Sequence, residues 1–229
     1  METRVAPPEI KTRILVVDDH PMMRASLIHL IEQQDDLICC GEAGSVAETQ
    51  TVVAKQKPDL AILDLRLKNA DGLELIKSLK AQFPELKILV MSQCEGSVYA
   101  ERALRAGALG YLDKEQAADE VLNAIRTVLG GSVYLTRGLA ALLLHHFVGS
   151  HSKGPRKDGS PLTDRELHVL ELLGSGMSTR EIAGALNLSF KTIETHRENI
   201  KHKLGLNGAA ALMRYASEWA RQQSRTDIQ

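Results

Sequence analysis

Four short apolar runs in the first half of the chain each lead into polar residues. The runs and the residues that follow them are 13–17 with Asp18 and Asp19, 60–63 with Asp64, 87–91 with Ser92, and 108–111 with Lys114. Longer segments with helical spacing separate the runs, which predicts parallel strands joined by right-handed crossovers. Because the carboxyl ends of parallel strands meet at one edge of an open sheet, we expect these polar side chains to lie close together.

The alternation of strands and helices continues to about Leu129 and predicts five strands with five helices. The fold class that follows is α/β, with a five-stranded doubly wound parallel sheet. No apolar residue follows Val148 until the end of the segment 149–161, which is typical of a linker, and all later patterns are helical. We therefore predict a first domain at 12–131, a linker with a helix at 132–161, and a small all-α domain at 162–222.

The composition limits the compartment and the binding partners that we expect for the protein. A net charge of -1 means that any nucleic-acid-binding face must be local. The three cysteines are too few for a disulfide framework, and two of them are adjacent, which favours a reducing compartment. The chain opens without a secretory signal, and its longest apolar stretch, 139–144, is too short to span a bilayer. We therefore expect a cytoplasmic protein with no membrane partner.

The polar residues at the predicted sheet edge suit a phosphoryl transfer. Three carboxylates close together repel one another, and Mg²⁺ relieves this repulsion because it binds carboxylate oxygens while keeping several waters. Asp64 can then attack phosphorus as a nucleophile and form an aspartyl phosphate. Ser92 can donate a hydrogen bond to one phosphoryl oxygen, and Lys114 can neutralise another. Adjacent acids after a single strand are equally typical of a solvated loop, so the interpretation depends on the complete set.

Five motifs around these runs resemble the receiver domain of two-component response regulators, and they lie at 14–19, 59–64, 70–72, 90–92 and 107–114. The resemblance covers roughly the first 130 residues and implies a flavodoxin-like fold. It implies Asp64 as the phosphoacceptor. It also implies Asp19 and Asp64 as direct Mg²⁺ ligands, together with the backbone carbonyl of Arg66 and with Asp18 in support.

By position, Ser92 and Tyr111 resemble the receiver switch pair, in which the hydroxyl moves to the phosphoryl group and the ring swings inward. Tyr111 is open to a second interpretation as a half-buried strand aromatic. Lys114 is likewise open to interpretation as a solvated lysine at the start of a helix.

Three positions depart from the usual receiver pattern. Lys68 stands where receivers usually have proline, and Gln93 stands where a small residue is usual. Arg66 places a long cation at the mouth of the pocket. These departures could slow or accelerate the loss of the phosphoryl group, but none of them removes a required group.

Motifs at 162–166, 176–183 and 192–200 resemble the LuxR-type helix-turn-helix domain. Two helices joined by 187–189 fit this motif, whose second helix enters the major groove of DNA. Its apolar residues Ile193, Ile200 and Leu204 are predicted to face the core. Its polar residues are predicted to contact DNA, and they are Lys191, Thr192, Glu194, Thr195, His196, Arg197, Asn199, Lys201 and Lys203.

The two ends of this helix are expected to differ in what they contact. Lys191, Thr192 and Thr195 lie at the entering end, where we expect contacts to bases. Lys201 and Lys203 lie at the far end, where the helix leaves the bases, so we expect contacts to phosphates.

Two residue types in this helix leave alternatives open. Glu194 and Glu198 repel phosphate and are typical of a solvated helix face. A glutamate can nevertheless accept a hydrogen bond from cytosine N4. His196 has no second metal ligand at suitable spacing, so we expect it to contact phosphate or backbone.

Together the two halves resemble the NarL/FixJ group of response regulators. The resemblance implies a transcriptional regulator rather than an enzyme, phosphorylated by a sensor histidine kinase and binding promoter DNA as a homodimer in a bacterial cytoplasm. Two other classes stay open: an Mg²⁺-dependent phosphatase that uses paired aspartates, and an adaptor that acts without phosphorylation. Beryllofluoride binding at Asp64 would separate the regulator from the adaptor, and turnover of small phosphoesters would favour the phosphatase.

Overall fold

The structure of the protein is a computed structural model that describes residues 11–67, 71–92, 97–114, 117–149, 162–186 and 188–225. The chain divides into two compact units. The first unit comprises residues 1–94 and 102–136, and the second comprises residues 95–101 and 137–229. Lys68, Gln93 and residues 150–161 of the predicted linker lie outside the described residues.

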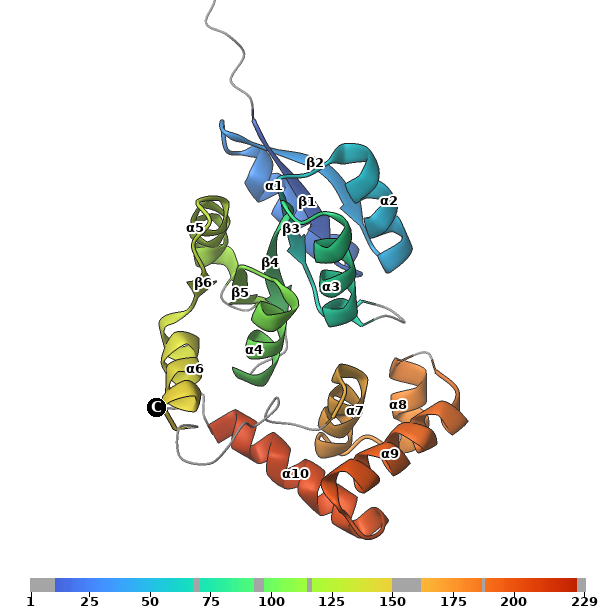
Figure 1. The fold of residues 1–229 in the computed structure, drawn as a ribbon. Helices are drawn as coiled ribbons and strands as arrows, with labels where there is room; N and C mark the ends of the chain where they lie inside the picture. Colours follow the sequence, from blue (N-terminus) through green and yellow to red (C-terminus); the bar gives the residue numbers. More distant parts are fainter. Residues whose placement is uncertain are drawn as a thin grey trace, which may run out of the picture. The chain divides into compact units, whose positions relative to one another are not determined.

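The first unit is built on one parallel sheet (Figure 1), with neighbouring strands in the order β2-β1-β3-β4-β5-β6. The strands are β1 (Thr12–Val17), β2 (Leu37–Ala43), β3 (Leu60–Leu63), β4 (Lys87–Ser92), β5 (Gly110–Asp113) and β6 (Tyr134–Leu135). The first five are the predicted strands, and the order reverses between β1 and β3, as in a doubly wound fold. The two-residue β6 is an addition: it pairs with β5 at the sheet edge and lies beyond residue 131.

Helices connect the strands, and among the described residues side chains cap the start of two of them. The connecting helices are α1 (Pro21–Glu32), α2 (Val46–Gln56), α3 (Gly72–Gln82), α4 (Ser97–Ala106) and α5 (Ala117–Leu129). Ser45 caps α2 by accepting from the Glu48 N–H. Ser45 and Glu48 do not complete a capping box, because the Glu48 carboxylate accepts from the Gly44 N–H rather than from the Ser45 N–H.

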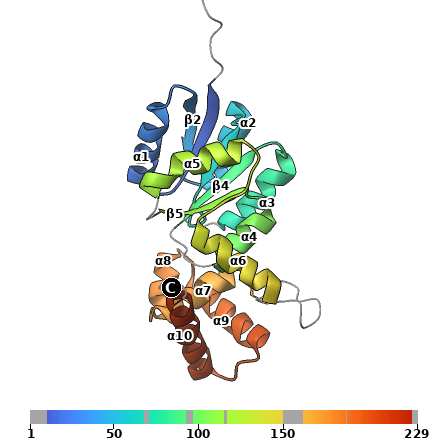
Figure 2. The ribbon, with the colours of Figure 1, turned by 90° about the vertical axis from the view of Figure 1, so that its left-hand side faces the viewer.

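The core of the first unit is aliphatic and lies on both sides of the sheet. Both views show α1 and α5 on one side of the sheet and α2 and α3 on the other (Figures 1 and 2). On the first side, Leu27 and Ile31 of α1 and Ile125 and Val128 of α5 pack in one cluster with strand residues. All four residues of β3 are buried, because helices cover both of its faces. This packing fixes the strand ends at which the polar residues lie.

The second unit is helical and contains α6 (Arg137–Gly149), α7 (Asp164–Gly174), α8 (Thr179–Ala185), α9 (Phe190–Leu204) and α10 (Ala209–Arg225). Thr163 and Glu166 form a capping box at the start of α7, and Ser178 and Glu181 form another at α8. Ser189 caps α9 by accepting from the Thr192 N–H. Gly205 ends α9 in the left-handed conformation, with a φ of 64° that glycine adopts without strain.

The core of the helical unit confirms which face of α9 is buried. Ile193 and Ile200 have no exposed surface and pack with Leu170 of α7, Ile182 of α8 and Leu212 of α10. Leu204 is only partly buried against this cluster. No helix among the described residues is both long and apolar enough to cross a membrane.

Candidate functional site

The ladder between β1 and β3 brings the first two carboxylates together. Val17 and Leu63 are register partners at the ends of these strands, and the Asp64 N–H donates to the Val17 carbonyl at 2.9 Å. Asp18 and Asp64 therefore leave neighbouring strands at the same level. Asp18 is 1 % exposed and Asp64 is 2 % exposed, so both carboxylates need partners inside the protein.

Lys114 supplies that partner from the end of β5. Its Nζ lies 2.6 Å from Asp18 Oδ2 and 2.6 Å from Asp64 Oδ2. Burial alone would lower the pKa of Lys114, but the carboxylates of Asp64 and Asp18 outweigh burial and raise the pKa above its usual value. This contact excludes the interpretation of Lys114 as a solvated lysine, because the residue is only 8 % exposed.

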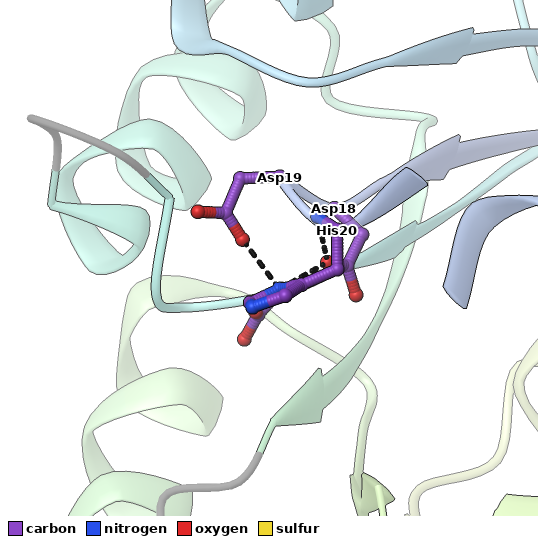
Figure 3. Close-up of side chains that lie close together, drawn as sticks. Asp18, Asp19 and His20 are labelled. Carbon is purple, nitrogen blue, oxygen red and sulfur yellow. Dashed lines mark hydrogen bonds and ion pairs between the residues drawn. The ribbon is translucent and has the colours of Figure 1, made fainter. Parts of the chain in front are cut away.

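Asp19 and His20 complete the acidic end of the pocket (Figure 3). The Nδ1 atom of His20 lies 2.7 Å from Asp19 Oδ1 and 3.2 Å from Asp18 Oδ1. Sequence reasoning did not include His20, although its position directly after the two aspartates was a signal. Arg24 of α1 holds the same loop, because its Nη1 donates to the Asp18 carbonyl at 2.7 Å.

The donor set fits a small hard cation. One ligand atom from each of Asp18, Asp19, His20 and Asp64 lies within 4.8 Å of all the others. Oxygens bound to one octahedral Mg²⁺ lie at most about 4.2 Å apart, so modest side-chain rotations would suffice. Asp19 Oδ1 is buried, and although His20 Nδ1 lies 2.7 Å away, no hydrogen bond of good geometry reaches this oxygen from the residues that the structure describes. A cation would satisfy this oxygen.

The remaining predicted residues lie at the same edge. Ser92 is fully buried at the end of β4 and pairs in register with Asp113, directly before Lys114. Tyr111 pairs with Val90 and is 3 % exposed, so its ring is buried rather than half-buried. The Arg66 N–H donates to Asp64 Oδ1 at 3.1 Å, and the role of the Arg66 carbonyl as a metal ligand stays a prediction.

A close backbone contact after Asp64 explains the glycine of the 70–72 motif. A Cβ atom at Gly72 would lie 2.5 Å from Leu65 Cα and 2.6 Å from the Leu65 carbonyl oxygen. We expect Gly72→Ala to lower the free energy of unfolding by about 1–3 kcal/mol and to displace the loop after Asp64.

Urea unfolding and labelling by acetyl phosphate would measure the two effects of Gly72→Ala. Gly138→Ala in α6 is the matched control, because nothing lies within 4 Å of the added methyl group. Wild-type stability and labelling in Gly72→Ala would contradict the proposed contact.

The residues of α9 that are predicted to contact DNA differ in their exposure to solvent. Lys191, Thr195 and Asn199 are exposed, as a contact surface requires. Thr192 is partly buried, and its hydroxyl lies 2.7 Å from that of the capping Ser189.

Two cations predicted to contact DNA, Arg197 and Lys203, are engaged with neighbouring helices of the helical unit. Arg197 Nη1 donates to Thr179 Oγ1 of α8 and to Glu194 Oε1. Lys203 Nζ donates to Glu166 Oε2 of α7 at 2.6 Å. Sequence periodicity missed these contacts because it assigns a face to each residue but cannot show that a long side chain folds back onto a neighbouring helix.

His196 also differs from its predicted role. Its ring is partly buried, and Nδ1 has no hydrogen-bond partner among the described residues. Burial, followed by the nearby Arg165 guanidinium, lowers the pKa of His196 below its usual value. A neutral, partly buried ring beside α7 does not suit a phosphate contact.

Comparison with known families assigns both units. Residues 14–126 match the family "Response regulator receiver domain", and residues 160–216 match "Bacterial regulatory proteins, luxR family". The transcriptional regulatory protein MctR of Rhizobium johnstonii is 33% identical over 208 residues, which cover 90% of this chain and 93% of MctR. This chain is a two-component response regulator of the NarL/FixJ group.

Solved structures of other response regulators share this fold. RcsB of Salmonella enterica serovar Typhimurium, bound to promoter rprA in the presence of the phosphomimetic BeF3-, is 26% identical with a TM-score of 0.61. The match covers 91% of this response regulator and 99% of the RcsB chain. A structure of two RcsB dimers bound to two parallel DNAs is also 26% identical, with a TM-score of 0.57, and covers 91% of this chain and 98% of that one.

Membership in this group makes the protein a DNA-binding transcription regulator of a two-component system. The receiver supplies the acidic pocket, and the LuxR-type domain supplies α8 and α9 as the two helices of its helix-turn-helix motif.

Proposed function

We propose that Asp64 is the phosphoacceptor of this response regulator and that a sensor histidine kinase is the phosphoryl donor. The observation that supports this most directly is the position of Lys114 Nζ, 2.6 Å from both Asp64 Oδ2 and Asp18 Oδ2. An ammonium at that point can neutralise a phosphoryl oxygen as soon as the group is attached to Asp64.

The residues around Asp64 have distinct tasks in this proposal. The Asp64 carboxylate attacks phosphorus, and the bond between phosphorus and the kinase histidine breaks. Asp19 and Asp64, with the Arg66 carbonyl and with Asp18 in support, would hold Mg²⁺. When bound, Mg²⁺ neutralises charge on the transferred group and on the carboxylates. The Ser92 hydroxyl would then donate a hydrogen bond to a phosphoryl oxygen.

The output is proposed to be phosphorylation-dependent binding of promoter DNA through α9. Movement of Ser92 toward the phosphoryl group, with Tyr111 as its partner, would change the receiver surface and favour a homodimer. The RcsB structures support this proposal, since one contains a promoter with a phosphomimetic and another contains dimers on DNA. A bacterial cytoplasm is the compartment that suits promoter DNA as the ligand.

Acetyl phosphate with Mg²⁺ tests the phosphoacceptor. We expect intact-mass spectrometry to show one added phosphoryl group on the wild-type protein and none on Asp64→Asn or after chelation of Mg²⁺. Asp59→Asn is the control, because Asp59 is exposed and lies directly before the start of β3, whereas Asp64 lies directly after its end. Labelling that persists in Asp64→Asn would contradict the assignment.

Beryllofluoride tests the coupling to DNA. The treated protein should sediment as a dimer and bind promoter fragments more tightly than the untreated protein. An unchanged oligomeric state and unchanged DNA affinity would favour the adaptor, and turnover of small phosphoesters would favour the phosphatase.

A further inference from the structure

The exposed face of α9 carries carboxylates, which is unusual for a surface that meets a polyanion. Lys191, Glu194, Thr195 and Glu198 follow the spacing i, i+3, i+4 and i+7, so they share one face of the helix. This face lies away from Ile193 and Ile200, which have no exposed surface. A carboxylate on this face repels the phosphates of DNA. If this face meets DNA, the carboxylate therefore needs a hydrogen-bond donor on the edge of a base.

Glu194 differs from Glu198 in how firmly it is held. Glu194 Oε1 accepts from Arg197 Nη1 at 3.1 Å, and the same Nη1 donates to Thr179 Oγ1 of α8. The Arg197 side chain is 18 % exposed and is therefore fixed between two helices. Glu198 pairs with Lys201 of its own helix at 2.8 Å, and its side chain is 67 % exposed.

The arrangement leaves one acceptor of Glu194 available. The Glu194 side chain is 41 % exposed, and its Oε2 accepts no hydrogen bond from the part of the chain that the structure describes. Arg197 neutralises the carboxylate and fixes its rotamer, which lowers the entropy lost when a base binds. Arg197 is thus placed to position Glu194 rather than to contact a phosphate.

The chemistry of the major groove selects the base. Guanine presents two acceptors and thymine presents the O4 acceptor, so both repel a carboxylate. Adenine has an N6 donor beside the N7 acceptor, whereas cytosine presents its N4 donor without a neighbouring acceptor. We infer that Glu194, positioned by Arg197 and Thr179, reads a cytosine in each operator half-site. This inference rests on the proposed binding of DNA through α9.

The test begins with the full-length protein carrying beryllofluoride and Mg²⁺, which selects duplexes from a randomised library. The selected duplex is then the probe for fluorescence anisotropy. We expect one cytosine per half-site whose replacement by thymine weakens wild-type binding about tenfold. In Glu194→Gln the amide can donate to thymine O4, so this preference should fall to within about twofold.

Two further variants separate positioning from phosphate contact. Glu198→Gln should keep the preference at that cytosine. Arg197→Met should lose the preference while keeping the wild-type dependence of affinity on salt. A salt slope lower by about one in Arg197→Met would show a phosphate contact and contradict the positioning role. Because Arg197→Met removes an internal contact, Trp219 fluorescence checks its folding, and Glu194→Gln alone decides the base assignment.

Failure of this inference and failure of the proposed function give different results. If the wild-type protein selects a sequence but Glu194→Gln leaves every base preference unchanged, the assignment of cytosine is wrong and specific DNA binding by the protein stands. If the wild-type protein selects no sequence, specific DNA binding is wrong, and the role of Glu194 is wrong with it.

Discussion

Lys114→Met is expected to lower the stability of the first unit by about 3 kcal/mol when Mg²⁺ is absent. The variant leaves the Asp18 and Asp64 carboxylates, each with 2 % of its side chain exposed, without the ammonium that lies 2.6 Å from both. Breaking a buried ion pair on one side costs more than the pair contributes, because the remaining charges stay desolvated. Mg²⁺ should restore part of the loss, since it can neutralise the same carboxylates.

Hydrogen exchange of the β1 and β3 amides in the full-length protein would measure this loss with and without Mg²⁺. Lys77→Met is the matched control. The Lys77–Glu74 pair has the same 2.6 Å separation, but its side chains are 52 % and 65 % exposed. Lys77→Met should therefore change the free energy of unfolding by less than about 1 kcal/mol. Equal effects of the two substitutions would show that the Lys114 contacts contribute no more than a surface pair.

The receiver site could be predicted closely because its geometry follows from strand order. Asp18, Asp64 and Lys114 each stand directly after a strand, and parallel pairing brings strand ends together whatever the helices do. His20 stands at the N-cap of α1 but makes no side-chain cap, and it was missed because histidine there carries no capping signal. The two-residue β6 was missed because a strand of that length has no detectable periodicity.

The helical unit was predictable in its elements but not in its side-chain contacts. Thr163 and Ser189 cap the starts of α7 and α9, and both are residue types from which a helix start can be recognised in a sequence. Arg197 and Lys203 were expected to face DNA because they are cations on a polar helix. The structure pairs them within the unit, and such pairing depends on the distance between helices, which a single sequence does not contain.

Lys201 and Lys203 have different partners in the structure, so their substitution should have different effects. Sequence reasoning gave Lys201 and Lys203 the same role as phosphate contacts. In the structure Lys201 pairs with a Glu198 side chain that is 67 % exposed, whereas Lys203 pairs with a Glu166 side chain that is 3 % exposed. Lys203→Met should therefore destabilise the helical unit, and Lys201→Met should lower the salt slope of DNA binding by about one.

We expect Lys203→Met to lower the free energy of unfolding by about 2 kcal/mol at neutral pH. The effect is smaller than for a fully buried pair, because a third of the Lys203 side chain is exposed and Glu166 keeps its hydrogen bond from the Thr163 N–H at 2.7 Å. Urea unfolding followed by Trp219 fluorescence reports on this unit, since Trp219 packs against its core. Lys201→Met, on the same helix, should change stability by less than about 1 kcal/mol.

Acidification should distinguish this ion pair from simple packing. Burial alone would raise the pKa of Glu166, but the Lys203 ammonium and the Thr163 hydrogen bonds lower the pKa below its usual value. Because the pKa of Glu166 is lowered in the folded state, the ionised carboxylate stabilises the wild-type fold above the unfolded pKa of about 4.3. This stabilisation is lost as pH falls through the folded pKa.

In Lys203→Met the folded-state pKa of Glu166 should rise, so protonation of Glu166 relieves the buried charge. The stability difference between wild type and Lys203→Met should therefore be largest at neutral pH, and it should shrink as pH falls through the Glu166 pKa of the variant and then through the lower Glu166 pKa of the wild type. A difference that stays constant with pH would mean that Lys203 acts through the packing of its methylene groups.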